Sequence, residues 1–374
     1  MNGQTSEKRR TPDWGRVLLV AVVALLVAGT GMVLVPRDSG TPAPVSFSES
    51  ARAEASSDAV ELLESAGALS SAEAPEAKTP ALAGVVTLLT TQARALMAPG
   101  ATTVSSAPAS TLTPGPAAAT RASLLEHLSA SGRKRLADAR EADGGIARLL
   151  AAVGTAQLIH SETLAASWQL PLPAAPSSPA NAEASTTVPA ATPTAAACPS
   201  VSPTPKPSSA TTDSALAAAV RSQQEAVYAY QVAQKRLDAG AATLAAKDLQ
   251  VHALLLRQAE ALTRANCGDV PPASAGYQLP ELFAKNPAAA LGALEASSLP
   301  GFADLVALST GETRAWALDG LLASARRSVA WGAALPALPG VTFDAGQLPA
   351  LPTPGTASAP VQATSAPAQA TSAG

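Results

Sequence analysis

Residues 213–240 read DSALAAAVRSQQEAVYAYQVAQKRLDAG and have the spacing of an amphipathic helix. Asp213 can cap the first turn, and Gly240 lies where such a helix should stop. Four apolar residues recur on one face at helical intervals: Leu216, Val220, Val227 and Leu237. A second helix is expected from Ala242 to Asn266, so the sequence predicts a tight helical hairpin.

Two further helices are expected after this hairpin. Asn286-Pro287 begins the first of them, in which Pro300 should bend or break the helix. The last helix is expected from Glu312 to Trp331, after Gly311. Four helices with short or medium connections favour an antiparallel four-helix bundle over residues 211–347.

Composition places the whole chain in the all-α class. Hydrophobic residues make up 47% of the chain but aromatic residues only 3%, so apolar character comes from Ala, Leu and Val. That balance suits closely packed helices better than strands. The net charge of -3, without a basic stripe, argues against a nucleic-acid partner.

Proline-rich blocks divide the chain into regions. Residues 171–210 are a linker rich in Pro, Ala, Ser and Thr, and residues 348–374 repeat Gln-Ala-Thr-Ser-Ala as a tail expected to be disordered. Between the N-terminus and the linker, residues 48–170 are expected to form a first helical lobe of four helices. Whether this lobe packs against the bundle, and the oligomeric state, are left open by the sequence.

The N-terminus predicts where the protein is located. Val17–Val35 is an unbroken apolar run of 19 residues, preceded by basic residues that include Arg9, Arg10 and Arg16. As a helix, this run would span roughly 28 Å, close to the hydrocarbon thickness of a bilayer. The positive-inside rule then makes residues 1–16 a cytoplasmic tail, 17–35 a transmembrane helix and 36–47 an extracytoplasmic stalk. We therefore expect a single-pass protein of the cell membrane whose C-terminal bulk is extracytoplasmic.

Two alternatives for this segment remain. A cleavable signal peptide shares the basic start and the apolar middle, but its apolar core is usually shorter and ends at a small-x-small site. Export by the twin-arginine route is permitted only weakly by Arg9-Arg10. Under each alternative the bulk of the chain still lies outside the cytoplasm.

Two runs in the second half carry a family resemblance. Residues 223–230, and residues 303–307 leading through 310–317 to Arg327 and Trp331, resemble the actinobacterial ferritin-like domain family of unknown function. The likeness covers residues 211 to about 340 and consists of bundle-core patterns. It implies a ferritin-like four-helix bundle outside an actinobacterial cell, with no agreed activity.

Ferritin-like bundles often hold two metals, so the resemblance raises the question of whether this chain has the ligands for them. A di-iron or di-manganese site takes a Glu from each of two helices and a Glu-x-x-His pair from each of the other two. The candidates here are Glu225, His252, Glu295 and Glu312. His252 is the only histidine of this lobe and has Leu249 three residues before it, so no intact di-metal site is expected.

Other chemistry is not indicated by the sequence. His127, His160 and His252 lie in expected helices without a nucleophile-elbow pattern nearby, so no catalytic residue is assigned. Cys198 and Cys267 are the only cysteines and lie in the expected oxidising compartment, where a disulfide between them is plausible. The alternative is two unpaired thiols.

Two functions follow from these observations. The first is a non-enzymatic binding or structural module of the cell envelope, held in the membrane by one helix, with an unidentified envelope protein or ligand as partner and no cofactor. The second is a ferritin-like metal-binding oxidoreductase or metal-storage module that uses iron or manganese.

Overall fold

The computed structural model describes residues 45–73, 79–97, 119–174 and 210–351. Within these ranges the chain is helical and contains no strand, as the composition predicted. The described residues from Ser46 onward belong to one compact unit. The expected transmembrane helix, nearly all of the linker and most of the C-terminal tail lie outside the described residues.

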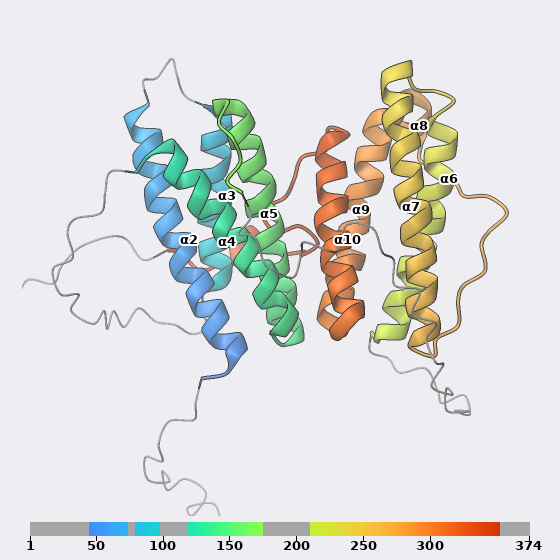
Figure 1. Cartoon of the computed structure of the whole chain (residues 1–374), viewed down its shortest axis with the longest axis horizontal. Helices are drawn as coiled ribbons and strands as arrows, with labels where there is room; N and C mark the ends of the chain where they lie inside the picture. The colour runs from blue at the N-terminus through green and yellow to red at the C-terminus, as the bar shows by residue number, and fades with distance from the viewer. Residues whose placement is uncertain (1–44, 74–78, 98–118, 175–209, 352–374) are drawn as a thin grey trace, which may run out of the picture. The chain divides into compact units, whose positions relative to one another are not determined.

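The first bundle contains four helices (Figure 1): α2 (Phe47–Ala72), α3 (Pro80–Leu96), α4 (Arg121–Glu141) and α5 (Gly144–Trp168). Local hydrogen bonds set where two of its helices begin. The Ser46 side chain caps the N-terminus of α2, and Thr120 forms a capping box with Ser123 at the N-terminus of α4. Helices α4 and α5 approach closely at two glycines: a Cβ on Gly154 would lie 2.6 Å from the carbonyl oxygen of Gly132. Small residues at this crossing therefore set the spacing of the two helices.

The second bundle also contains four long helices: α6 (Thr212–Ala233), α7 (Ala239–Ala265), α9 (Pro287–Leu308) and α10 (Gly311–Ala330). A short helix, α8 (Glu281–Lys285), lies between α7 and α9, and a 3-10 turn (Ala345–Gln347) follows the bundle. The helical hairpin and the two later helices expected from the sequence are thus present.

Helix ends differ in detail from the expectation. The cap of α6 is Thr211, whose hydroxyl accepts from the backbone of Ser214, whereas Asp213 lies inside the first turn. Asp238 caps α7 instead of ending the helix before it. Pro300 does not break α9, which continues to Leu308. The flanking Leu299 and Phe302 are both buried, so packing holds the helix together across the lost hydrogen bond.

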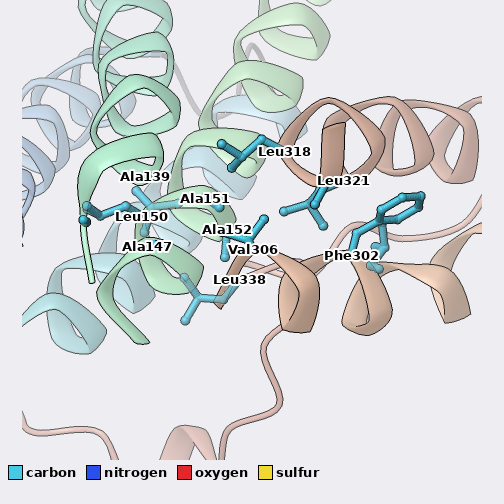
Figure 2. Close-up of a cluster of buried hydrophobic side chains, with 14 of the residues drawn as sticks. Ala139, Ala147, Leu150, Ala151, Ala152, Phe302, Val306, Leu318, Leu321 and Leu338 are labelled. Carbon is cyan, nitrogen blue, oxygen red and sulfur yellow. The ribbon is translucent and has the colours of Figure 1, made fainter. Parts of the chain in front are cut away.

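One hydrophobic cluster joins the two bundles (Figure 2). Leu150, Ala151 and Ala152 of α5 pack in the same cluster as Val306 of α9 and Leu318 of α10. Ala307 of α9 passes so close to Gly144 that its carbonyl oxygen would overlap a Cβ at that position. The sequence left open whether the two lobes pack together, and the structure shows that they share a core.

Polar contacts reinforce this junction. The Arg314 guanidinium of α10 donates to the carbonyl oxygens of Arg140 and Ala142, at the C-terminal end of α4. Arg148 of α5 forms an ion pair of 2.6 Å with Asp304 of α9. Bonds to the last carbonyls of a helix replace the partners that those groups lack inside it. The bundles are thus joined by hydrogen bonds as well as by apolar packing.

The segment after α10 crosses back to the first bundle. Arg94 of α3 donates to the carbonyl oxygens of Leu348 and Pro349, and Gln92 donates to that of Ala337. Leu348 and Pro349, at the start of the expected tail, are therefore held on α3. The remaining tail residues, 352–374, lie outside the described residues.

Within the described ranges, only α9 (Pro287–Leu308) is long and apolar enough to cross a bilayer, and 44% of its apolar window is buried inside the protein. Helix α9 packs against α5, α6 and α10, which accounts for its apolar composition. The segment Val17–Val35 lies outside the described residues, and its role as an anchor stays a prediction.

Candidate functional site: a buried polar cluster in the second bundle

Two of the four candidate metal ligands meet in the bundle core. His252 of α7 and Glu295 of α9 are 43 positions apart, yet Nε2 of the imidazole lies 2.6 Å from Oε1 of the carboxylate. Both side chains are buried, with residue exposures of 2% and 1%. Of the four candidates, only this pair is in direct contact.

The other two candidates lie elsewhere. Glu225 is half-buried on α6 and lines a separate cavity of about 540 Å³ next to the loop that contains Pro271 and Tyr277. Glu312 is exposed in the first turn of α10. Neither carboxylate is among the hydrogen-bond partners of His252 or Glu295.

The Glu295 carboxylate is surrounded by donors from the other three helices. Oε1 accepts hydrogen bonds from the Tyr230 hydroxyl at 2.7 Å and from Arg327 Nε at 3.0 Å, in addition to His252. Oε2 accepts from the Ser324 hydroxyl at 2.7 Å. We call these five residues the Glu295 cluster: Tyr230, His252, Glu295, Ser324 and Arg327.

Helical periodicity places these side chains together. Ser324 and Arg327 are three residues apart on α10 and so share a face, and Arg327 also donates to the Ser324 hydroxyl at 3.0 Å. On α6, Gln223 and Tyr230 are seven residues apart, which also places them on one face. Gln223 Oε1 lies 2.9 Å from Nδ1 of His252. Each of the four long helices thus contributes at least one polar group to the centre of the bundle.

The charge of the cluster follows from its partners. With the Gln223 amide oxygen towards Nδ1 and the Glu295 carboxylate at Nε2, both imidazole nitrogens of His252 face acceptors. Each ring nitrogen of His252 therefore has an acceptor within hydrogen-bond distance. The Arg327 guanidinium supplies a positive charge at 3.0 Å from the Glu295 carboxylate.

The pKa shifts of Glu295 and Tyr230 agree with an ionised Glu295 carboxylate. Burial raises the pKa of this carboxyl group, but the hydrogen bond from His252 and the charge of Arg327 outweigh that effect. The pKa is therefore lowered from 4.5 to about 2. Burial and the neighbouring Glu295 charge both raise the pKa of Tyr230, so its hydroxyl remains protonated and donates. The network is therefore consistent in its donors and acceptors at neutral pH.

A second polar pair lies beside the cluster. The indole nitrogen of Trp331, at the end of α10, donates to Oδ2 of Asp248 on α7 at 2.9 Å. Burial raises the pKa of Asp248, while this hydrogen bond and the charge of Arg327 oppose the rise. The Tyr230 ring packs against the His252 ring with centroids 4.8 Å apart, and against Trp331 at 6.2 Å. Aromatic packing therefore encloses the polar groups.

The donor set of the cluster differs from that of a di-metal centre. Such a centre needs several carboxylates and two histidines directed at shared ions. The cluster offers one histidine and one carboxylate, and the described ranges contain no group of three or more His, Cys, Asp or Glu placed to hold a metal. The Arg327 guanidinium contacts the carboxylate oxygen that a cation would use. These residues do not fit a di-metal site.

Sequence reasoning found His252 and Glu295 but missed their partners. The sequence does not single out Tyr230 or Arg327 as a partner of Glu295, and it gives Ser324 no role. A signal existed, since Ser324 and Arg327 fall on the stripe of α10 that also carries the buried Leu321 and Ala325. Polar residues at core positions of an amphipathic helix indicate a buried network.

Cys267 follows the end of α7 and has a positive φ of 58°. Cys198 lies outside the described residues. The disulfide between them stays a prediction.

Comparison with known proteins gives one family match, in the second half of the chain. Residues 215–343 match a family model described as a domain of unknown function (DUF4439). Searches of curated proteins and of solved structures found no match. The matched range is about a third of the chain and contains the second bundle from its second turn onward. Every residue of the Glu295 cluster lies within the range that this family model matches.

Proposed function

We propose that this chain is a membrane-anchored, extracytoplasmic protein of the cell envelope that acts as a non-enzymatic binding or structural module. Val17–Val35 would be its anchor and the two joined bundles its extracytoplasmic body. In this proposal the second bundle is ferritin-like and of the actinobacterial family that its sequence resembles, but has no working di-metal centre.

One observation carries the non-enzymatic part of the proposal. Both oxygens of the Glu295 carboxylate accept hydrogen bonds from protein donors, one of which belongs to the Arg327 guanidinium. A carboxylate bound in this way has little capacity left for a metal ion, and a cation would have to displace a fixed positive charge. The cluster therefore supports a structural role.

The ferritin-like part of the proposal is supported by position. All four long helices of the second bundle direct polar groups at its centre, which is where ferritin-like bundles hold their metals. The match to a domain of unknown function over residues 215–343 is compatible with this family. In this proposal the ion-paired cluster occupies the place of the metal centre.

Such a network would fix the arrangement of the four helices. Alanine-rich helices such as α6 and α7 can slide or rotate against one another at little cost, because small apolar side chains fit several packings. A buried, fully hydrogen-bonded charge can be satisfied in only one of them, and buried polar groups specify register in some helical assemblies. A rigid bundle is what a binding or structural module requires.

A metal-binding oxidoreductase or storage module is the second candidate. The observation that favours it is the contact of 2.6 Å between His252 and Glu295, since imidazole and carboxylate are both good ligands for iron and manganese. For this pair to bind a cation, Arg327 would have to move away.

Elemental analysis separates the two candidates. The full chain is purified in detergent after expression with iron, manganese and zinc supplied, and the bound metal is measured by mass spectrometry. We expect metal at background, with no difference between wild type and the His252→Ala variant. About two metal ions per chain, lost on substitution of His252, would overturn the proposal and favour the second candidate.

Membrane anchoring is tested separately. The full chain should sediment with membranes, resist extraction by high salt and be released by detergent. Deletion of residues 17–35 should abolish this behaviour. Release of the intact chain by salt alone would refute the anchor.

A further inference from the structure

A groove of about 1030 Å³ opens between α2 and α4 of the first bundle. It lies outside the residues matched by the family model and apart from the Glu295 cluster. Its lining includes Leu62 and Leu124 of the bundle core, which are only 4% and 1% exposed, and the exposed Ala68 and Ala130 form part of its apolar surface. The groove is therefore an open channel with an apolar base, large enough for a small organic ligand.

The α2 wall of this groove is acidic. Asp58, Glu61 and Glu64 recur every three residues and so lie along one side of the helix. Side chains at this spacing have Cβ atoms about 5–6 Å apart. The wall is thus a regular row of negative charges.

The two cationic side chains near this row, Lys134 and Arg135, pair mainly with other carboxylates. Part of the row is therefore left without a cationic partner. Lys134, at one end of the groove, forms ion pairs with Glu54 at 3.1 Å and with Asp138 at 3.3 Å. Arg135 reaches Asp58 at 3.6 Å but also contacts Glu54 and Asp138. Among the described residues, neither Glu61 nor Glu64 forms an ion pair. The groove therefore keeps an excess of negative charge.

A buried hydroxyl on the opposite wall lacks a partner. Ser131 of α4 is only 8% exposed, and its Oγ has no hydrogen-bond partner among the described residues, although it lines the groove. A buried hydroxyl without a partner is unfavourable, so a ligand that donates a hydrogen bond there would be favoured. On the facing wall, burial raises the pKa of Asp58 even though the Arg135 charge opposes the rise. A ligand with a cationic donor would offer a partner to both groups.

We infer that this groove binds a linear organic polycation of the polyamine class. Its ammonium groups would pair with the row formed by Asp58, Glu61 and Glu64, and one of them would donate to the Ser131 hydroxyl. Alkyl segments of three or four methylene groups can span the interval between neighbouring carboxylates and lie on the apolar surface at Ala68 and Ala130. Those segments explain the apolar floor, which a small inorganic cation would not use.

A metal ion fits this groove less well. The carboxylates stand one helical turn apart, and no group of three or more His, Cys, Asp or Glu in the described ranges is close enough to coordinate one ion. A ligand whose charges are themselves spaced along a chain matches the row without bringing the carboxylates together. The inference concerns the first bundle and does not depend on the proposed function of the second.

The test is isothermal titration calorimetry of the full chain in a non-ionic detergent, with spermine and spermidine as probes. Butylamine, with one ammonium group, and Mg²⁺ are the comparison ligands. We expect one saturable polyamine site per chain, with spermine binding more tightly than spermidine and both much more tightly than butylamine. Added salt should weaken binding, because the contacts are ionic and partly exposed.

Variants locate the site. The Glu61→Gln/Glu64→Gln double variant should bind spermine about tenfold more weakly, since two partly exposed ion pairs are lost. The matched control is Glu126→Gln/Glu281→Gln, which removes the same charge from exposed positions outside the groove. Circular dichroism checks that both variants are folded.

Three results would overturn the inference. The first is the absence of saturable polyamine binding, and the second is equal weakening by the groove and control variants, which would indicate diffuse attraction to a negative protein. The third is binding of Mg²⁺ as tight as that of spermine. Retention of spermine binding by the control variant, with loss in the groove variant, would support it.

Discussion

Replacing Glu295 with Gln tests the central role assigned to the buried cluster. The substitution preserves the size of the side chain and removes its charge. It also replaces one of the two acceptor oxygens with an amide NH₂ group, which donates. Tyr230, Arg327 and Ser324 donate to this carboxylate in the wild type, so the new amide group would face donors. The variant thus leaves a buried guanidinium without its counter-charge.

The magnitude can be obtained in two ways. Breaking a buried ion pair by removing one partner typically costs about 3–5 kcal/mol. The pKa of Glu295 is lowered from 4.5 to about 2 in the folded protein, and each pH unit between these values corresponds to about 1.4 kcal/mol of stability, which gives about 3 kcal/mol. A loss of about 3 kcal/mol should lower the melting temperature of a body of this size by roughly 6–12 °C.

The pH dependence has a definite sign. A carboxyl group whose pKa is depressed on folding stabilises the protein above its unfolded pKa, and this contribution is lost as the pH falls through the folded value. Wild type should therefore lose the contribution of Glu295 between about pH 4.5 and pH 2. The Gln variant lacks this contribution at every pH, so its stability should decline less over that interval.

The assay is thermal and urea unfolding of the full chain in detergent, followed by circular dichroism at neutral and acidic pH. Glu225→Gln is the matched control, because it makes the same change in the same bundle at a half-buried residue outside the cluster. The control should shift the melting temperature by no more than a surface substitution does. If Glu295→Gln destabilised the protein no more than Glu225→Gln, the Glu295 cluster would not stabilise the second bundle as proposed.

Two further predictions concern other parts of the chain. Gly144→Ala should destabilise the protein by about 1–3 kcal/mol in urea unfolding, because the new Cβ would overlap the carbonyl oxygen of Ala307, whereas Gly145→Ala, with open space around it, should be neutral or slightly stabilising. Thiol titration of the denatured, unreduced chain should detect no free thiol if Cys198 and Cys267 are bonded, and two after reduction; two thiols before reduction would refute the disulfide.

Helical structure could be predicted because its causes are local. Apolar residues at intervals of three and four, Pro80 at a first turn and Gly311 between helices are visible in the sequence and act within a few residues. The differences lie mostly at helix ends, where several polar residues compete to cap the same turn. They also include Pro300, which does not break α9, and the short helix α8. Thr211 and Asp213 are both good caps, and only the backbone conformation decides between them.

The candidate site could be predicted only in part. The sequence indicated His252 and Glu295 because histidine and glutamate are the ligand types of a ferritin-like bundle. It indicated neither that they contact each other nor that Arg327 and Tyr230 complete the network, since these contacts join helices far apart in the chain. Glu225 and Glu312 are of the same residue type as Glu295, but they do not belong to the cluster. Glu225 lines a separate cavity beside α6, and Glu312 is exposed in the first turn of α10.

The sequence by itself determined the all-helical class, the hairpin of α6 and α7 and the apolar run that predicts a membrane anchor, because each depends on the order of neighbouring residues. Only the tertiary structure decided that both bundles share one core and that Glu295 is enclosed by donors from three other helices. The physical reason is the small size of the packing residues. Alanine- and glycine-rich faces, such as those at Gly144 and Gly154, can fit many partners, and the partner chosen depends on the steric and hydrogen-bonding fit of the whole assembly.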